Sequence, residues 1–254
     1  MTATLNTIRR LTTLITTCVL LGSSLSSSHA AEVPLSQAQQ YLATAEQFRG
    51  PQQSFVLQGR IETIKAGRSE KMQPYQLLSG EDRKSLVIFT GGTSQGQKVL
   101  LQDQQFWLQL PGSRRALRIT PLQKLMGEAS SGDVATLNWQ QDYQLVAADE
   151  QSDGIQLSLQ AKREGLSYQR IELWVSNTDQ FPLRAEFYLP SGKQAKSARF
   201  VRSQAGEAPR VVAMELLDRM HSKDVTVLHY DMVTPQTLPA RLFNPQALST
   251  VQAI

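Results

Sequence analysis

Residues 106–143 read FWLQLPGSRRALRITPLQKLMGEASSGDVATLNWQQDY, and they interrupt a long alternation of apolar and polar positions. The segment starts as a strand and turns at a Pro-Gly pair. From Pro121 onward, Leu122, Leu125 and Met126 recur at helical spacing. This pattern predicts a helix that begins at the proline and has one apolar side.

A second, shorter helix is predicted at the end of the same segment. Ser131 is placed to cap it, and Asp133 falls in its first turn, where a negative charge is favoured. Val134 and Leu137 follow at helical spacing. Together the two helices predict a lid, residues 119–140, whose apolar underside rests on the strands around it.

The rest of the chain alternates with a period of two residues, as strands with one apolar face do. Such runs, separated by short turns, are found at 54–63, 72–78, 85–89, 98–101, 105–110, 143–148, 155–161, 168–175, 181–189, 198–203, 210–217 and 224–232. Short connections require antiparallel neighbours. We therefore predict one domain built on a large, curved antiparallel sheet.

An apolar hollow is predicted on one side of this sheet. The lid, an amphipathic helix at 36–49 with Ser36 as its cap, and a docked tail at 238–248 are the segments available to cover it. A large sheet with so little cover leaves either a ligand site or a packed core. The residues expected to line the hollow from the strands and the lid are Phe55, Leu57, Ile61, Ile88, Leu108, Leu122, Leu125, Met126, Leu137, Leu157, Leu173, Phe187 and Met214.

The first 30 residues have the pattern of a cleaved signal peptide. Arg9 and Arg10 precede a mainly apolar run at 11–25, and a Ser-His-Ala cleavage site follows it at 28–30. The run is too short and too rich in Thr and Ser to span a bilayer. Cleavage would remove Cys18, the one cysteine, and leave 24 basic against 22 acidic residues in a domain at 31–254. We therefore expect a periplasmic protein that does not bind nucleic acid.

One enzyme motif is present, a G-x-S-x-G pattern at residues 92–96 with Ser94 as its serine. A nucleophile elbow needs a helix after the serine, whereas the residues that follow here alternate as a strand does, which favours a glycine-rich hairpin. The histidines left after cleavage, His221 and His229, do not have the spacing of a three-ligand metal site. We expect no catalytic residue, no metal and no cofactor.

Three arginines, Arg114, Arg115 and Arg118, follow the Pro-Gly turn at the edge of the expected hollow. Guanidinium groups bind carboxylates and phosphates in a bidentate manner. They are interpreted either as rim residues that contact an anionic head group or a partner, or as a solvated turn.

The same segment resembles the LolA-like outer-membrane lipoprotein-sorting proteins. The matching elements are Trp107-Leu108, Leu110-Pro111, Arg114-Arg115, Arg118-Ile119, Gly132-Asp133 and Asp142-Tyr143, followed downstream by Phe181-Pro182-Leu183, the strand at 209–217, residues 226–231 and Leu242-Phe243. The resemblance implies an incomplete, half-open antiparallel barrel of about eleven strands, mainly β with α, whose hollow is plugged by helices.

The resemblance also implies a function without enzymatic turnover. The protein would be a monomeric periplasmic carrier that binds acyl chains of lipoproteins or phospholipids in the hollow, receives them from an inner-membrane exporter and delivers them to an outer-membrane acceptor. Three alternatives stay open: a lipoprotein-sensing regulator with the same fold, a serine hydrolase that uses Ser94, and an assembly factor whose hollow is filled by its own side chains.

Overall fold

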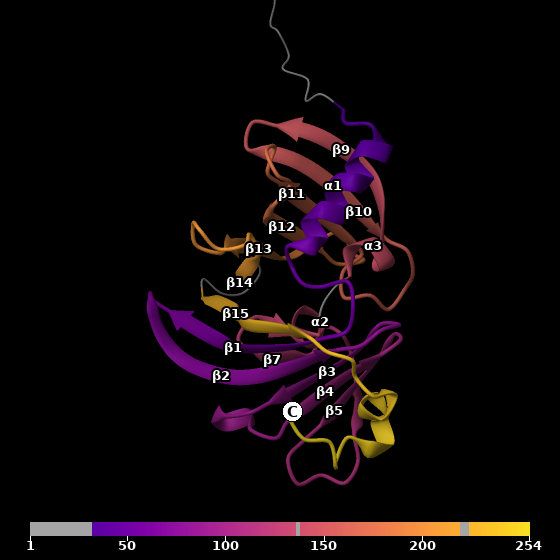
Figure 1. Ribbon diagram of the computed structural model, residues 1–254, viewed down its shortest axis with the longest axis vertical. Helices are drawn as coiled ribbons and strands as arrows, with labels where there is room; N and C mark the ends of the chain where they lie inside the picture. Colours follow the sequence, from indigo (N-terminus) through magenta and orange to yellow (C-terminus); the bar gives the residue numbers. More distant parts are fainter. Residues whose placement is uncertain (1–31, 136–137, 219–223) are drawn as a thin grey trace, which may run out of the picture.

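The computed structural model describes residues 32–135, 138–218 and 224–254. Its main feature is one 13-stranded antiparallel sheet with the order β6-β5-β4-β3-β2-β1-β15-β14-β13-β12-β11-β10-β9 (Figure 1). The strands are β1 (Phe55–Lys65), β2 (Arg68–Ser79), β3 (Lys84–Phe89), β4 (Lys98–Gln102), β5 (Gln105–Gln109), β6 (Leu117–Ile119), β9 (Tyr143–Gln151), β10 (Gly154–Ala161), β11 (Arg170–Val175), β12 (Pro182–Tyr188), β13 (Gln194–Arg202), β14 (Val211–Asp218) and β15 (Val225–Pro235).

The sheet bends into two wings (Figure 1). The first wing consists of β1 to β6 and the second of β9 to β15, and they meet where β1 pairs with β15. A bulge in β1 between Gln58 and Gly59 lies at this junction, and a Cβ on Gly59 would be 2.3 Å from the backbone oxygen of His229. Bulges increase strand twist and bending, and this one requires glycine. Within the described residues the sheet ends at β6 and β9 without closing, so the predicted half-open barrel is confirmed. The sheet has thirteen strands rather than about eleven, and β6 lies at the edge of the segment predicted to be a lid.

The first helix, α1 (Leu35–Gln47), contacts β9 and α3 and covers the wing formed by the later strands (Figure 1). The prediction of an amphipathic helix here is confirmed, because Ala38, Leu42 and Ala45 are buried. The predicted cap is wrong: Pro34 occupies the N-cap position, so Ser36 lies inside the first turn.

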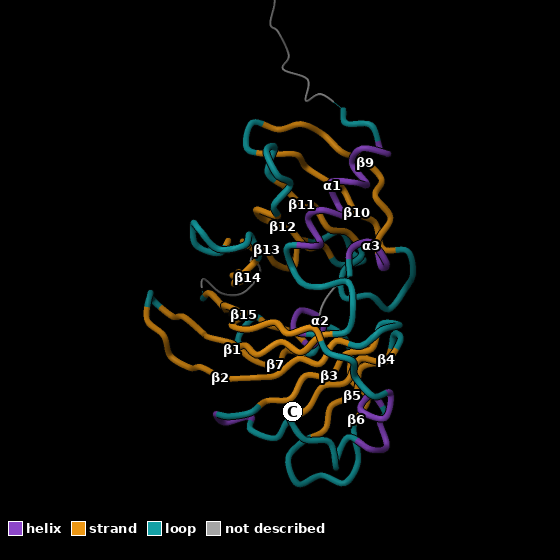
Figure 2. The backbone as a smooth tube through the Cα atoms, viewed as in Figure 1, coloured by secondary structure: helices purple, strands orange, loops and turns teal. Residues whose placement is uncertain are grey.

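Apolar side chains cover both faces of the first wing. The larger cluster fills the concave face of the sheet beneath α1 and the lid. A smaller cluster on the opposite face packs beneath the C-terminal segment, residues 238–254, and contains Leu86, Leu100, Phe243, Leu248 and Val251. This segment includes two 3-10 helices, η2 (Ala240–Phe243) and η3 (Pro245–Ala247), and runs along the outside of β3 to β5 (Figure 2). The predicted docked tail is therefore confirmed.

The lid differs from its prediction in its first half. A hairpin of β7 (Lys124–Met126) and β8 (Ala129–Ser130) stands where the helix from Pro121 was expected. Gly127 has a φ of 53° and forms the tight turn that reverses the chain. The second helix is confirmed as α2 (Ser131–Val134), and α3 (Trp139–Asp142) follows it. The N-cap of α2 is Ser130 rather than the predicted Ser131.

Candidate functional site: the covered concave face

Most residues predicted to line the hollow do lie on the concave face. Those buried in its cluster are Phe55, Leu57, Ile61, Met126, Leu157, Leu173, Phe187 and Met214. Leu108 and Leu125 are half-buried against the same cluster. In this structure these side chains pack against one another and against their cover.

Two of the predicted residues lie elsewhere, and a third is not described. Ile88 belongs to the opposite face, beneath the C-terminal segment, because Val87 and Phe89 on either side of it face the concave cluster. Leu122 is 41% exposed and is not part of the buried concave cluster. Leu137 lies outside the described residues.

The β7–β8 hairpin of the lid lies across the junction of the two wings. The backbone N–H of Glu128 donates to the hydroxyl of Thr226 on β15 at 2.8 Å. A Cβ on Gly127 would lie 2.3 Å from that hydroxyl and 2.9 Å from the methyl of Thr63 on β1. The hairpin turn therefore touches the two central strands directly, and Figure 1 shows β7 and α2 between the wings.

A buried polar cluster, which we call the latch, fixes α2. One carboxylate oxygen of Asp133 accepts hydrogen bonds from the backbone N–H and the hydroxyl of Ser130, and from the ammonium of Lys196 at 2.8 Å. The other accepts from the hydroxyl of Tyr168 at 2.7 Å. Lys196 also donates to the backbone oxygen of Glu128 at 2.7 Å. One lid carboxylate is thus bonded to β13 and to the loop before β11.

Burial and the nearby Asp133 carboxylate raise the pKa of the Tyr168 hydroxyl well above its usual range. The tyrosine hydroxyl therefore stays protonated and continues to donate to Asp133.

The start of α2 approaches the same loop so closely that only glycine fits. A Cβ on Gly132 would lie 2.0 Å from the hydroxyl oxygen of Ser167. Ser131 donates its hydroxyl to the backbone oxygen of Thr120 at 2.9 Å, within the lid. At the other end of α2, the hydroxyl of Ser85 on β3 donates to the backbone oxygen of Ala135 at 2.8 Å. The lid is therefore bonded to both wings.

α3 is capped by a residue of a different helix. The carboxylate of Glu46 on α1 accepts hydrogen bonds from the backbone N–H groups of Trp139 at 2.7 Å and Gln140 at 3.1 Å. The guanidinium carbon of Arg49 lies 4.1 Å from the centroid of the Trp139 ring. Burial lowers the pKa of Arg49, which the neighbouring Glu46 opposes. Because a negative charge stabilises the N-terminus of a helix, Glu46 ties α1 to the end of the lid.

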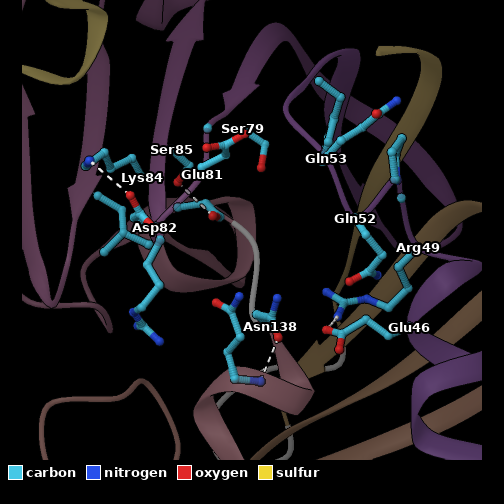
Figure 3. A pocket seen from close by; sticks show the side chains of 18 of the residues that line it. Glu46, Arg49, Gln52, Gln53, Ser79, Glu81, Asp82, Lys84, Ser85 and Asn138 are labelled. Atoms are coloured by element: carbon cyan, nitrogen blue, oxygen red, sulfur yellow. Dashed lines mark hydrogen bonds and ion pairs between the residues drawn. The ribbon is translucent and has the colours of Figure 1, made fainter. Parts of the chain in front are cut away.

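A pocket of about 150 Å³ opens beside the lid, between the end of α1, the turn after β2 and α3 (Figure 3). Figure 3 shows Glu46 and Arg49 together on one wall and Asp82 with Lys84 on another. Asp142, which also lines the pocket, is ion-paired with both Arg83 and Arg163. Phe55 and Leu101 line the same pocket, so its charged walls adjoin apolar residues of the concave cluster.

The three predicted rim arginines do not line this pocket. Arg114 and Arg115 are exposed on the turn between β5 and β6. Arg118 is exposed on β6, with its guanidinium carbon 5.9 Å from the centroid of the Trp107 ring, which packs on the opposite face of the sheet. Their predicted contact with an anionic head group stays a prediction.

The serine motif does not form a nucleophile elbow. Ser94 lies in a 3-10 turn, η1 (Gly92–Ser94), and strand β4 follows it, as the hairpin interpretation predicted. The imidazole of His229 is 2.8 Å from the carboxylate of Glu62, far along the sheet on β1 and β15. His221 lies outside the described residues. Within the described ranges, His, Cys, Asp and Glu residues form no cluster of three that could hold a metal ion.

A LolA superfamily protein from Nitrosomonas europaea is 30% identical to this chain, with a TM-score of 0.72 over 82% of this chain and 97% of the other. The chain belongs to the LolA superfamily. A family model described as "-like: Uncharacterized protein" matches residues 81–250 of the present chain. The search of curated proteins found no match to the chain.

Two further structures share the fold of this LolA superfamily chain at 19% identity and a TM-score of 0.65. One is described as an outer membrane lipoprotein-sorting protein domain from Vibrio parahaemolyticus, and the match covers 85% of this chain and 97% of that one. The other is a DUF1329 family protein from Desulfovibrio piger, with 85% and 99% covered. The predicted family resemblance and fold class are thereby confirmed. None of the helices in the described ranges has the length and apolar character needed to cross a membrane.

Proposed function

We propose that this LolA superfamily protein is a periplasmic carrier that binds acyl chains of lipoproteins or related lipids beneath its lid and moves them between the inner and outer membranes. It performs no chemical conversion. An inner-membrane exporter loads the carrier, and an outer-membrane acceptor unloads it.

The observation that most supports this function is that the lid is separate from the sheet it covers. β7 and β8 form their own two-stranded sheet, apart from the 13-stranded one. The β7–β8 hairpin of the lid can therefore move away without breaking any hydrogen bond between strands of the large sheet. Its movement would expose the concave apolar cluster, including Leu57, Ile61 and Leu157.

Burial energetics are compatible with reversible binding. Each methylene group taken out of water contributes about 0.8 kcal/mol, so one acyl chain gains on the order of 10 kcal/mol. Opening the lid costs the contacts of Met126 and the latch of Asp133, which lowers the net affinity. Because the cost of opening the lid lowers the net affinity for the cargo, a competing acceptor can remove it.

The charged surroundings suit the polar part of such a cargo. The pocket beside the lid joins charged walls to Phe55 and Leu101, and provides an entry for an acyl chain whose head group stays outside. Arg114, Arg115 and Arg118 are exposed cations on the β5–β6 edge, and we assign them contact with anionic head groups or with a partner surface.

A second candidate is an assembly factor that carries no lipid. The observation that favours it is the tight burial of the predicted lining residues against each other, with Ile61, Leu157 and Leu173 fully buried. In this case the lid is a permanent part of the core.

Site-specific crosslinking in cells distinguishes the two functions. A photoreactive residue at Leu57, on the concave face, should form adducts with acylated species in the envelope. The matched control is Leu100, which is as deeply buried but lies on the opposite face beneath the C-terminal segment. Lipid adducts at Leu57 that exceed those at Leu100 support the carrier. No acyl adduct at Leu57 in protein that is folded and exported would favour the assembly factor.

A further inference from the structure

A second cavity, of about 390 Å³, lies on the opposite face of the sheet from the lid. It is open to solvent on one side and is lined by the C-terminal segment, the glycine-containing turn after β3 and the turn after β5. Apolar walls come from Ile88, Leu110 and Pro111, and hydroxyl and amide groups come from Ser249 and Gln252. Phe89 also lines this cavity and belongs to the concave cluster, whereas the five residues named above do not.

Lys98 is the charged residue among those that line this cavity. On the sheet it is directly paired with Ile88 on one side and Gln109 on the other, so the three form one row across β3, β4 and β5. The lysine is only 6% exposed. A basic side chain of this kind is seldom buried without a charged partner.

The ammonium of Lys98 has unused hydrogen-bonding capacity. It donates to the backbone oxygen of Leu248 at 2.8 Å. An ammonium has three donors, and none of the carboxylates in the described ranges is ion-paired with it. Burial lowers the pKa of this lysine, and no acidic neighbour offsets the effect. A buried cation in this state is stabilised by any anion that enters the cavity.

The C-terminal segment holds the cavity open. Leu248 is bonded to Lys98, and the backbone of Ile254 is bonded to the side-chain amide of Gln76, which pairs with Ile88 on the neighbouring strand. Residues 249–253 therefore bridge two fixed points and form the roof of the space, without filling it.

We propose that this cavity is a binding site for a small organic anion, whose carboxylate pairs with Lys98 and whose short apolar body packs against Ile88, Leu110 and Pro111. The required ligand chemistry follows from the single buried cation in an apolar wall. The site is independent of the acyl-chain carrier function, because it lies on the other face of the sheet and does not involve the lid.

Calorimetric titration of the full chain with octanoate, octanol and inorganic phosphate tests the site. Octanoate should bind with one-to-one stoichiometry, and octanol and phosphate at least about tenfold more weakly, because each lacks one of the two required features. Lys98→Met should weaken octanoate binding about 10- to 100-fold, the usual effect of losing a hydrogen bond to a charged group. Lys193→Met, at an exposed turn, is the control with the same charge change and should leave binding unaltered.

A second variant keeps the test decisive if Lys98→Met does not fold. Ser249 is exposed at the cavity, so Ser249→Glu supplies a carboxylate beside Lys98 and should abolish octanoate binding at this cavity while the fold is kept. Any octanoate or octanol that binds beneath the lid should be unaffected by this variant. Octanoate binding that is unchanged in folded Ser249→Glu would overturn the proposal, and so would octanol binding that the variant weakens as much as it weakens octanoate binding.

Discussion

The ammonium of Lys196 lies 2.8 Å from a carboxylate oxygen of Asp133, and the two buried side chains are 63 positions apart in the sequence. This pair joins the lid to a central strand of the second wing. Breaking a buried ion pair by removing one partner is costly, because the other charge stays buried without compensation. The latch is therefore the point at which the lid is most sensitive to substitution.

Asp133→Asn should lower the free energy of unfolding by about 3 kcal/mol, because it leaves the ammonium of Lys196 without its carboxylate. Urea denaturation followed by circular dichroism measures the loss. The matched control is Asp153→Asn, which breaks an exposed ion pair with Arg184 and should change stability by less than about 1 kcal/mol. Equal effects of the two variants would contradict a buried latch.

Gly132→Ala should prevent α2 from seating against the loop before β11, since the added Cβ would lie 2.0 Å from the hydroxyl of Ser167. We expect destabilisation of about 1–3 kcal/mol, as for other overpacked sites. Hydrogen exchange of the lid amides gives the location of the effect. Adding Ser167→Gly to the same chain should restore protection, and a failure to do so would place the strain elsewhere.

Glu46→Gln should loosen α3, because the neutral amide accepts more weakly from the backbone N–H groups of Trp139 and Gln140. A loss of about 1–2 kcal/mol is expected for a helix cap of this kind. The variant also removes the charge next to Arg49. Thermal unfolding monitored by tryptophan fluorescence tests it, and an unchanged midpoint would show that the cap contributes nothing.

Phe243→Ala should cost about 3–5 kcal/mol, because the ring is buried in the cluster beneath the C-terminal segment. Leu122→Ala is the matched control: its side chain is 41% exposed on the lid, so a change of less than about 0.5 kcal/mol is expected. Denaturant titrations of both variants compare the two sites. A larger effect at Leu122 would restore the helical interpretation of this part of the lid.

Glu62 should make the protein less stable in acid. Hydrogen bonds from Ser69 first, and then from His229, lower the pKa of its carboxyl below its ordinary value. A carboxyl whose pKa is lower in the folded state than in the unfolded state stabilises the protein. This stabilisation is fully present above the unfolded-state pKa and is lost as the pH falls through the folded-state pKa. The stability difference between wild type and Glu62→Gln should therefore shrink on going from pH 7 to pH 3. A constant difference would show that ionisation of Glu62 is not involved.

The strands and the family could be predicted from the sequence because their signals are local. Period-two alternation marks the strands, and within each wing strands that follow one another in the sequence also pair with one another. In the large sheet of the described residues, only the pairing of β1 with β15 joins strands that are distant in the sequence. The face of a strand is a different matter. In β3 the run from Ser85 to Phe89 is buried on both faces, so alternation could not show that Ile88 belongs to the outer cluster.

The lid shows a second limit of local patterns. Leu122, Leu125 and Met126 have helical spacing, yet strands of three and two residues on either side of a glycine turn are also enough for a hairpin. Close contacts of Gly127 with Thr63 and Thr226 favour the hairpin. The latch and the Glu46 cap have no sequence signal of their own. Each joins residues that are distant in the chain, so they become visible only when the topology is known.

The pairing of β1 with β15 has a consequence for how this protein folds. Each wing consists of successive hairpins and can form from local contacts, whereas the seam between Ile61 and Leu228 joins residues from opposite ends of the domain. We therefore expect the seam to form late, after both wings are synthesised. Until then β1 and β15 are unpaired edges that favour aggregation, so this step is where the chain most needs a chaperone.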